Sequence, residues 1–220
     1  MTVVIIAGGS IDKEFAGGFI KGLDESSLFI IACDKGYESC LNLGVRPSLI
    51  IGDFDSAAEE SYDKAKASGI ELIKLNPIKD DTDAEAALDI AISKTESEDT
   101  IYLLGATGTR LDHVMGNIGL VGKGLKQNRK VIMVDKHNRI RMITNQQSYS
   151  LSKEDAFGKY VSVFAYLGPV KGLTMTGFKY PVEGAEVTGF NTLTVSNELV
   201  EDTGVITIES GYLVIMETAD

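Results

Sequence analysis

Apolar and polar residues alternate along the first part of the chain in a pattern typical of a parallel sheet covered by helices. Short runs rich in β-branched residues predict strands, and the longer stretches between them carry apolar residues at helical spacing. In the stretch 82–95, for example, Ala84, Leu88 and Ala91 lie at i, i+4 and i+7. The predicted strands are 2–7, 28–33, 48–52, 70–75, 100–104 and 130–134, and the predicted helices are 57–68, 82–95 and about 111–127. Strands that alternate with helices indicate βαβ units.

The pattern changes after about residue 138. Short segments rich in Val, Thr, Tyr and Phe are broken by glycines, as in 160–166, 203–208 and 212–216, and no helical period is present. Such segments predict antiparallel strands of a sandwich or a barrel. We therefore expect an α/β fold with two domains. The first is a mainly parallel, Rossmann-like domain over 1–144, and the second is a smaller all-β sandwich domain over 145–220.

Composition and charge exclude several classes of protein. The 220 residues are 44% hydrophobic and 24% charged, which excludes a disordered chain. The net charge of -11 would repel a phosphate backbone and an anionic membrane, so we expect no nucleic-acid and no membrane partner. The apolar runs are far shorter than the roughly 20 residues of a membrane helix, and the N-terminus lacks a signal-peptide pattern. We therefore expect a cytoplasmic protein in which Cys33 and Cys40 are reduced and structural.

Two carboxylates follow the third predicted strand, in the segment 50–56 (IIGDFDS). In open parallel sheets, ligands bind beyond the carboxyl ends of the strands. If this segment is extended, Asp53 and Asp55 point to the same side and could hold one hard cation. The alternative is a solvated turn before the next helix.

A second acidic segment, 79–83 (KDDTD), precedes the predicted helix 82–95. Asp81 or Thr82 would be a good N-cap, and Glu85 could complete a capping box, but capping explains only part of the acidic cluster. We expect the two acidic segments to lie at the same edge of the sheet, where carboxylates repel one another unless they are protonated or bridged by a cation. Donor sets made only of oxygen select Mg²⁺ or Mn²⁺. Together the segments favour metal-assisted phosphate chemistry.

A glycine-rich turn connects the strand 100–104 to the predicted helix 111–127. Its sequence, 104–113 (LGATGTRLDH), would let backbone N–H groups approach a phosphate, and Arg110 could bind that phosphate through two hydrogen bonds. The turn matches neither the P-loop nor the Rossmann glycine fingerprint. His113 and Asn117 lie at i and i+4 and share one helix face, which is either part of the site or an ordinary polar face.

In their order along the chain, these motifs resemble those of the thiamin pyrophosphokinase family. Its members share segments similar to 34–36 (DKG), 44–47 (GVRP), 52–56 (GDFDS), 81–83 (DTD) and 108–113 (GTRLDH) with Asn117. In the second half, 172–173 (GL), 177–180 (GFKY) and 196–197 (SN) resemble the family's thiamin-binding segment. Several motifs in one order are far more specific than any one of them.

The resemblance implies a homodimeric, Mg²⁺-dependent enzyme that transfers diphosphate from ATP to the hydroxyl of thiamin and releases AMP. The α/β domain would be catalytic, the sandwich would bind thiamin, and each active site would lie where the catalytic domain of one subunit meets the sandwich of the other. Asp53, Asp55 and Asp83 would be the metal-site acids and would also be catalytic. Arg110 and Asp112 would be catalytic too, and Arg110 would in addition contact the nucleotide. The other implied nucleotide-site residues are Asp34, Lys35, Asp81, Thr82, Gly108, Thr109, His113 and Asn117, and the implied thiamin contacts are Tyr180, Ser196 and Asn197.

Three positions depart from the family pattern. The family usually has glycine where this chain has Lys35 and Thr109, and often tryptophan where it has Tyr180. Lys35 could add a cation near the triphosphate, and Tyr180 could still stack on an aromatic ring. The role of Asp112 stays open between a general base, a metal ligand and a group that orients Arg110. The alternative functions are diphosphate transfer to another heteroaromatic alcohol, such as a hydroxymethylpterin, and a non-catalytic thiamin or nucleotide sensor.

Overall fold

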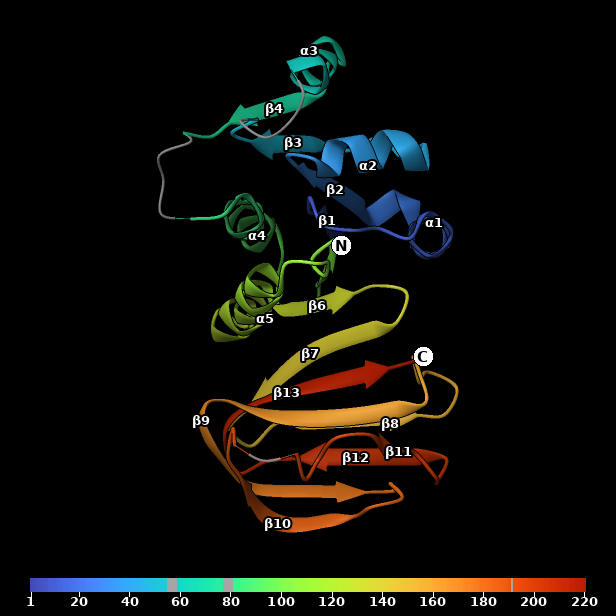
Figure 1. The fold of residues 1–220 in the computed structure, drawn as a ribbon, viewed down its shortest axis with the longest axis vertical. Helices are drawn as coiled ribbons and strands as arrows, with labels where there is room; N and C mark the ends of the chain where they lie inside the picture. Colours follow the sequence, from blue (N-terminus) through green and yellow to red (C-terminus); the bar gives the residue numbers. More distant parts are fainter. Residues whose placement is uncertain (55–58, 77–80, 191) are drawn as a thin grey trace. The chain divides into compact units, whose positions relative to one another are not determined.

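The chain forms two compact units, Met1–Lys136 and His137–Asp220 (Figure 1). The computed structural model describes residues 1–54, 59–76, 81–190 and 192–220. Each unit is described by itself below. None of the helices within these ranges is long and apolar enough to cross a membrane.

The first unit is built on a parallel sheet. Strand β1 (Thr2–Ile6) pairs in parallel with β2 (Leu28–Cys33) on one side and with β5 (Thr100–Leu104) on the other. Beyond them lie β3 (Leu49–Gly52) and β4 (Glu71–Lys74) next to β2, and β6 (Lys130–Val134) next to β5. The order is therefore β4-β3-β2-β1-β5-β6. The predicted parallel α/β region is confirmed, and each predicted strand lies within one or two residues of the observed one.

Helices connect the parallel strands. They are α1 (Lys13–Lys21), α2 (Gly36–Leu43), α3 (Glu59–Ala67), α4 (Asp83–Lys94) and α5 (Leu111–Lys126). Helix α2 contacts both α1 and α3, whereas α4 contacts α5. The chain runs from β1 outward to β4 and then crosses through α4 to β5, on the other side of β1. Because such crossovers are right-handed, α1 to α3 cover one face of the sheet and α4 and α5 cover the other. The strand order therefore reverses between β1 and β5.

Sequence periodicity predicted α3, α4 and α5 but missed α1 and α2. Both missed helices are short, and Gly17 and Gly18 lie inside α1, which weakens its helical signal. Local capping compensates in α1, since the Asp12 carboxylate accepts a hydrogen bond from the Phe15 N–H (2.9 Å). A short 3-10 helix, Glu25–Ser27, precedes β2.

Of the two predicted N-cap candidates, Thr82 caps α4, but the predicted capping box is only half present. The Thr82 hydroxyl accepts a hydrogen bond from the Glu85 N–H (3.2 Å). The Glu85 carboxylate accepts instead from Lys123 Nζ of α5 (2.9 Å), and Lys123 also pairs with Asp89. These ion pairs join α4 to α5, and both helices contribute residues to the site described below.

The second unit is antiparallel throughout its described strands. Strand β13 (Ser210–Thr218) pairs with β7 (Asn138–Thr144) and with the first half of β9 (Tyr160–Thr176). The second half of β9 pairs with β10 (Val182–Val187) and β12 (Thr203–Thr207), and β12 pairs with β8 (Ser148–Ser152). The short β11 (Asn197–Glu198) adds to the start of β9. The predicted antiparallel region is confirmed.

Strand β9 belongs to both layers of this unit. It passes from one to the other near Leu167, whose φ of 59° is left-handed. Side chains from both layers meet in one core, with Val163 and Ile215 from the first layer and Met175 and Ile206 from the second. The unit begins somewhat before the expected boundary at 144, because β7 pairs along its whole length with β13.

Candidate functional site

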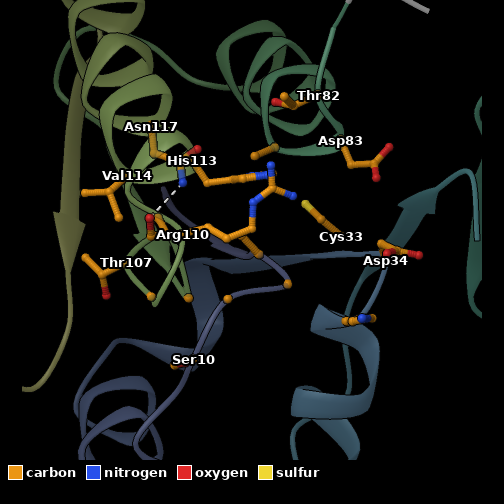
Figure 2. A pocket seen from close by; sticks show the side chains of 18 of the residues that line it. Ser10, Cys33, Asp34, Thr82, Asp83, Thr107, Arg110, His113, Val114 and Asn117 are labelled. Atoms are coloured by element: carbon orange, nitrogen blue, oxygen red, sulfur yellow. Dashed lines mark hydrogen bonds between the residues drawn. The ribbon is translucent and has the colours of Figure 1, made fainter. Parts of the chain in front are cut away.

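A cavity of about 700 Å³ opens at the carboxyl ends of the parallel strands in the first unit (Figure 2). Its lining comes from the turns that follow β1, β2, β3 and β5, from the start of α4 and from the first two turns of α5. The carboxyl ends of β1 and β5 border the point where the strand order reverses. This is where open parallel sheets bind ligands, because the connections diverge there and leave a crevice.

The cavity collects most of the residues that the sequence motifs indicated. Its lining includes Asp34, Lys35, Asp53, Asp81, Thr82, Asp83, Gly108, Thr109, Arg110, His113 and Asn117. Asp112 does not line it, and Asp55 lies outside the described residues. Residues from separate predicted motifs therefore share one cavity.

Sequence reasoning missed the turn after β1, where Gly8, Gly9 and Ser10 also line the cavity. This turn lies directly against the turn after β5. The Gly9 N–H donates to the Gly105 carbonyl (2.9 Å), and a Cβ atom at Gly9 would lie only 2.3 Å from that oxygen. Gly105 itself has a φ of 65°. The signal was present in the sequence, since an apolar strand ends in two glycines just as the strand before Asp53 ends in one.

Arg110 is held by Asp112 through two hydrogen bonds. Arg110 Nε lies 3.2 Å from Asp112 Oδ1, and Nη2 lies 2.6 Å from Oδ2. Oδ1 also accepts from the His113 N–H (2.9 Å). These bonds, those from Arg110 foremost, lower the pKa of Asp112 to about 2, and the same pair raises the pKa of Arg110. A carboxylate with so low a pKa is a weak proton acceptor, so the geometry favours an orienting role for Asp112.

Asn117 of α5 supports the glycine-rich turn. Its Nδ2 donates to the Ala106 carbonyl (2.7 Å), which ties α5 to the start of the turn (Figure 2). His113 and Val114 from the same helix also line the cavity. The face that His113 and Asn117 share is thus part of the cavity wall.

The four described acids of the cavity are Asp34, Asp53, Asp81 and Asp83. The premise that Asp53 and Asp55 lie in an extended segment is wrong, because Phe54 between them has a left-handed φ of 59°. Strict two-residue alternation does not apply through such a residue. Within the described ranges, no group of three His, Cys, Asp or Glu residues is placed to hold a metal ion. The predicted metal site includes Asp55, which lies outside the described residues, so this site stays a prediction.

Both cysteines are buried. Burial raises the pKa of the Cys40 thiol to about 12, which agrees with a structural role. Cys33, at the end of β2, additionally contributes to the cavity wall.

The expected thiamin residues lie together in the second unit. Asn197, only 4% exposed, accepts hydrogen bonds from the N–H groups of Tyr180 (3.0 Å) and Glu198 (2.9 Å) and donates to the Tyr180 carbonyl (2.8 Å). Ser196 has a left-handed φ of 58°, and its N–H donates to the Ser162 hydroxyl. The amide of Asn197 thus holds the backbone of Tyr180, whose side chain is exposed.

Comparisons with known proteins cover both units. Residues 20–133 match the family model for the thiamin pyrophosphokinase catalytic domain, and residues 148–213 match that for the thiamin pyrophosphokinase vitamin B1 binding domain. The chain is 35% identical over 219 residues to thiamine pyrophosphokinase of Bacillus subtilis (strain 168), which covers 100% of this chain and 99% of that protein.

Solved structures agree with these matches. The crystal structure of the Bacillus subtilis thiamine pyrophosphokinase superposes with a TM-score of 0.88 at 33% identity and covers 100% of both chains. That of the Geobacillus thermodenitrificans thiamin pyrophosphokinase gives 0.85 at 31% identity and covers 100% of this chain and 98% of the other. The chain therefore belongs to the thiamin pyrophosphokinase family of enzymes, with a catalytic and a vitamin B1 binding domain.

Proposed function

We propose that this enzyme uses ATP and Mg²⁺ to convert thiamin to thiamin diphosphate in one step. The hydroxyl oxygen of thiamin attacks the β-phosphorus of ATP, the bond from that phosphorus to the α–β bridging oxygen breaks, and AMP leaves. The hydroxyl proton passes to solvent or to a base that stays unassigned. The observation that carries the proposal is the cavity that unites acidic residues, glycine-rich turns and Arg110.

This chemistry requires neutralisation and alignment of charge more than covalent help from the protein. Bound Mg²⁺ would supply part of that neutralisation on the diphosphate oxygens. Asp53 and Asp83 share the cavity, and we propose that Asp55 completes the oxygen donor set with them. All three candidates are carboxylates, the donor type that Mg²⁺ prefers.

Arg110 supplies the fixed positive charge in this proposal. Its guanidinium pairs with Asp112, which leaves the remaining N–H groups to bind a phosphate oxygen. We assign Asp112 a positioning role, and we assign Asn117 a similar role through its bond to the Ala106 carbonyl. Lys35 adds a second cation to the cavity wall.

We further propose a homodimer in which each active site combines the catalytic domain of one subunit with the sandwich of the other. Large apolar side chains on both units support an interface. In the first unit, Leu111 and Met115 lie one turn apart on α5 and are 74% and 60% exposed. In the second unit, Phe190 is 101% exposed and Leu193 is 69% exposed. Clustered exposed apolar residues mark association surfaces.

The activity is tested by incubating the purified protein with thiamin, ATP and Mg²⁺ and separating the thiamin and adenine products by chromatography. Thiamin diphosphate that forms in step with AMP supports the proposal. Thiamin monophosphate with ADP would contradict it, and thiamin binding without product would favour a sensor. Parallel incubation with a hydroxymethylpterin tests the other acceptor.

The metal site is tested by Asp55→Asn, which should abolish turnover while the protein stays folded. Asp63→Asn, an exposed carboxylate of α3, is the matched control and should retain activity. Normal Mg²⁺-dependent activity of Asp55→Asn would remove Asp55 from the site.

The shared active site is tested by mixing two inactive variants, Arg110→Ala in the catalytic domain and Tyr180→Ala in the sandwich. After dissociation and random reassembly, half of the dimers are mixed, and each has one intact site if the sites are shared. The mixture should then regain about a quarter of the wild-type activity. Each variant alone should stay inactive. No recovery in a mixture shown to contain mixed dimers would mean that each subunit builds its own site.

A further inference from the structure

The cavity of the first unit has two chemically different halves. Its carboxylates, Asp34, Asp53, Asp81 and Asp83, come from the segments that follow β2 and β3 and from the start of α4. The lining segments 7–10 and 105–110, which follow β1 and β5, carry no carboxylate among the described residues and contribute glycines, hydroxyls and Arg110. The first half also carries Lys35, but its four carboxylates outnumber this one cation, so a phosphate without a metal ion is accepted more readily by the second half.

The turn after β1 is fixed in place beside this second half. The Ala7 N–H donates to the Leu104 carbonyl (2.8 Å), and the Gly9 N–H donates to the Gly105 carbonyl (2.9 Å). Gly108 faces the same turn, since a Cβ atom there would lie 3.5 Å from the Ser10 nitrogen and 3.9 Å from Ser10 Oγ. Because Gly108 has no side chain, it leaves that space open beside Ser10.

Ser10 is exposed and lines the cavity. Its hydroxyl has no hydrogen-bond partner among the residues that the structure describes. The neighbouring N-terminus of α1 does not compete for an anion, because the Asp12 carboxylate already caps it at the Phe15 N–H and also pairs with Lys136 (3.4 Å). Within this turn the hydroxyl of Ser10 is thus the side-chain donor available to a ligand.

We propose that Ser10 binds the α-phosphate of the nucleotide, the phosphate that stays with AMP when the diphosphate is transferred. The inference rests on the proposed function, since it takes ATP as the donor. The transferred diphosphate lies with its metal at the carboxylate half, and the α-phosphate lies at the glycine-rich half, where Ser10 donates to it. Ser10 precedes the residues 20–133 that match the catalytic-domain family model.

The test is calorimetric binding of AMP and of inorganic pyrophosphate with Mg²⁺ to the full chain. A hydrogen bond to a charged group predicts that Ser10→Ala weakens AMP binding about 10- to 100-fold. Pyrophosphate binding and the KM for thiamin should stay unchanged. Ser10→Thr keeps the hydroxyl and should restore AMP affinity. Ser93→Ala, which removes an exposed hydroxyl from α4, is the matched control and should bind AMP normally.

Two results would overturn this assignment. Wild-type AMP affinity in Ser10→Ala would remove Ser10 from the site, and an equal loss of AMP and pyrophosphate affinity would mean that the substitution disturbs the whole cavity. Thermal unfolding of each variant controls for folding. The outcome is independent of turnover, because a wild-type protein that binds AMP but forms no thiamin diphosphate would refute the proposed function and still test Ser10.

Discussion

A buried glutamate of the second unit, Glu217 on β13, should control the stability of that unit. It is 0% exposed, and its carboxylate accepts hydrogen bonds from Arg139 Nε (2.9 Å), the Tyr149 hydroxyl (2.9 Å) and the Phe157 N–H (3.2 Å). Arg141 lies 3.5 Å away as a second cation. Glu217 is therefore the shared acceptor of a buried polar cluster at the edge of the core.

The substitution Glu217→Gln keeps the shape of the side chain and removes its charge. The side chains of Arg139 and Arg141 are only 21% and 20% exposed, so both would lose a counter-ion that water cannot fully replace. Breaking a buried ion pair by removing one partner costs about 3–5 kcal/mol. In a unit of this size, such a loss should lower the melting temperature by more than about 10 °C.

Scanning calorimetry and urea unfolding measure this effect. The matched control is Asp202→Asn, which breaks the Lys153–Asp202 pair (3.3 Å), whose side chains are 50% and 100% exposed. That surface pair should contribute about 0–1 kcal/mol. If Glu217→Gln costs no more than the control, the cluster does not stabilise the unit and the reasoning fails. A double variant with Arg139→Gln should lose less than the sum of the single losses, because the two residues interact directly.

Three further predictions concern the first unit. Gly9→Ala should destabilise the protein and weaken AMP binding in calorimetry, because the new Cβ would lie 2.3 Å from the Gly105 carbonyl oxygen. Arg110→Lys should lower kcat/KM about 10-fold or more in steady-state assays, because lysine cannot form the two parallel bonds to Asp112. Cys40→Ala should flatten the alkaline loss of stability in thermal melts. Burial raises the pKa of the Cys40 thiol to about 12, so the folded state keeps a proton that the unfolded thiol releases from about pH 9, and stability falls as the pH rises through this range.

Local pattern accounts for much of what was predicted. Strand runs such as 28–33 and 100–104 were located correctly because burial on both faces of a parallel sheet requires continuous apolar sequence. Thr82, one of the two predicted N-cap candidates, does cap α4, because capping depends on neighbours in the chain. Helix α1 was missed because its interior glycines weaken the helical pattern in the sequence. The Asp12 cap and packing against α2 stabilise this helix in the folded chain.

The candidate site was predictable to the extent that parallel strands end at one edge. That rule alone puts Asp53, Asp83 and Arg110 near one another, and they do line one cavity. It could not reveal the left-handed Phe54, because a single φ angle depends on how the turn packs. The AGGS turn at 7–10 obeyed the same rule and was overlooked.

The linear order of residues was enough to establish the α/β and antiparallel regions and the motifs of the family. These features follow from short-range periodicity and from residue identity, which do not need long-range contacts. Only the tertiary structure shows which side chains and turns from separate segments contact one another. Asn117 holds the Ala106 carbonyl, Asn197 holds the backbone of Tyr180, and the Gly9 turn closes on Gly105. Each partnership depends on distances and directions that arise when separate segments pack together, so only the folded chain could define them.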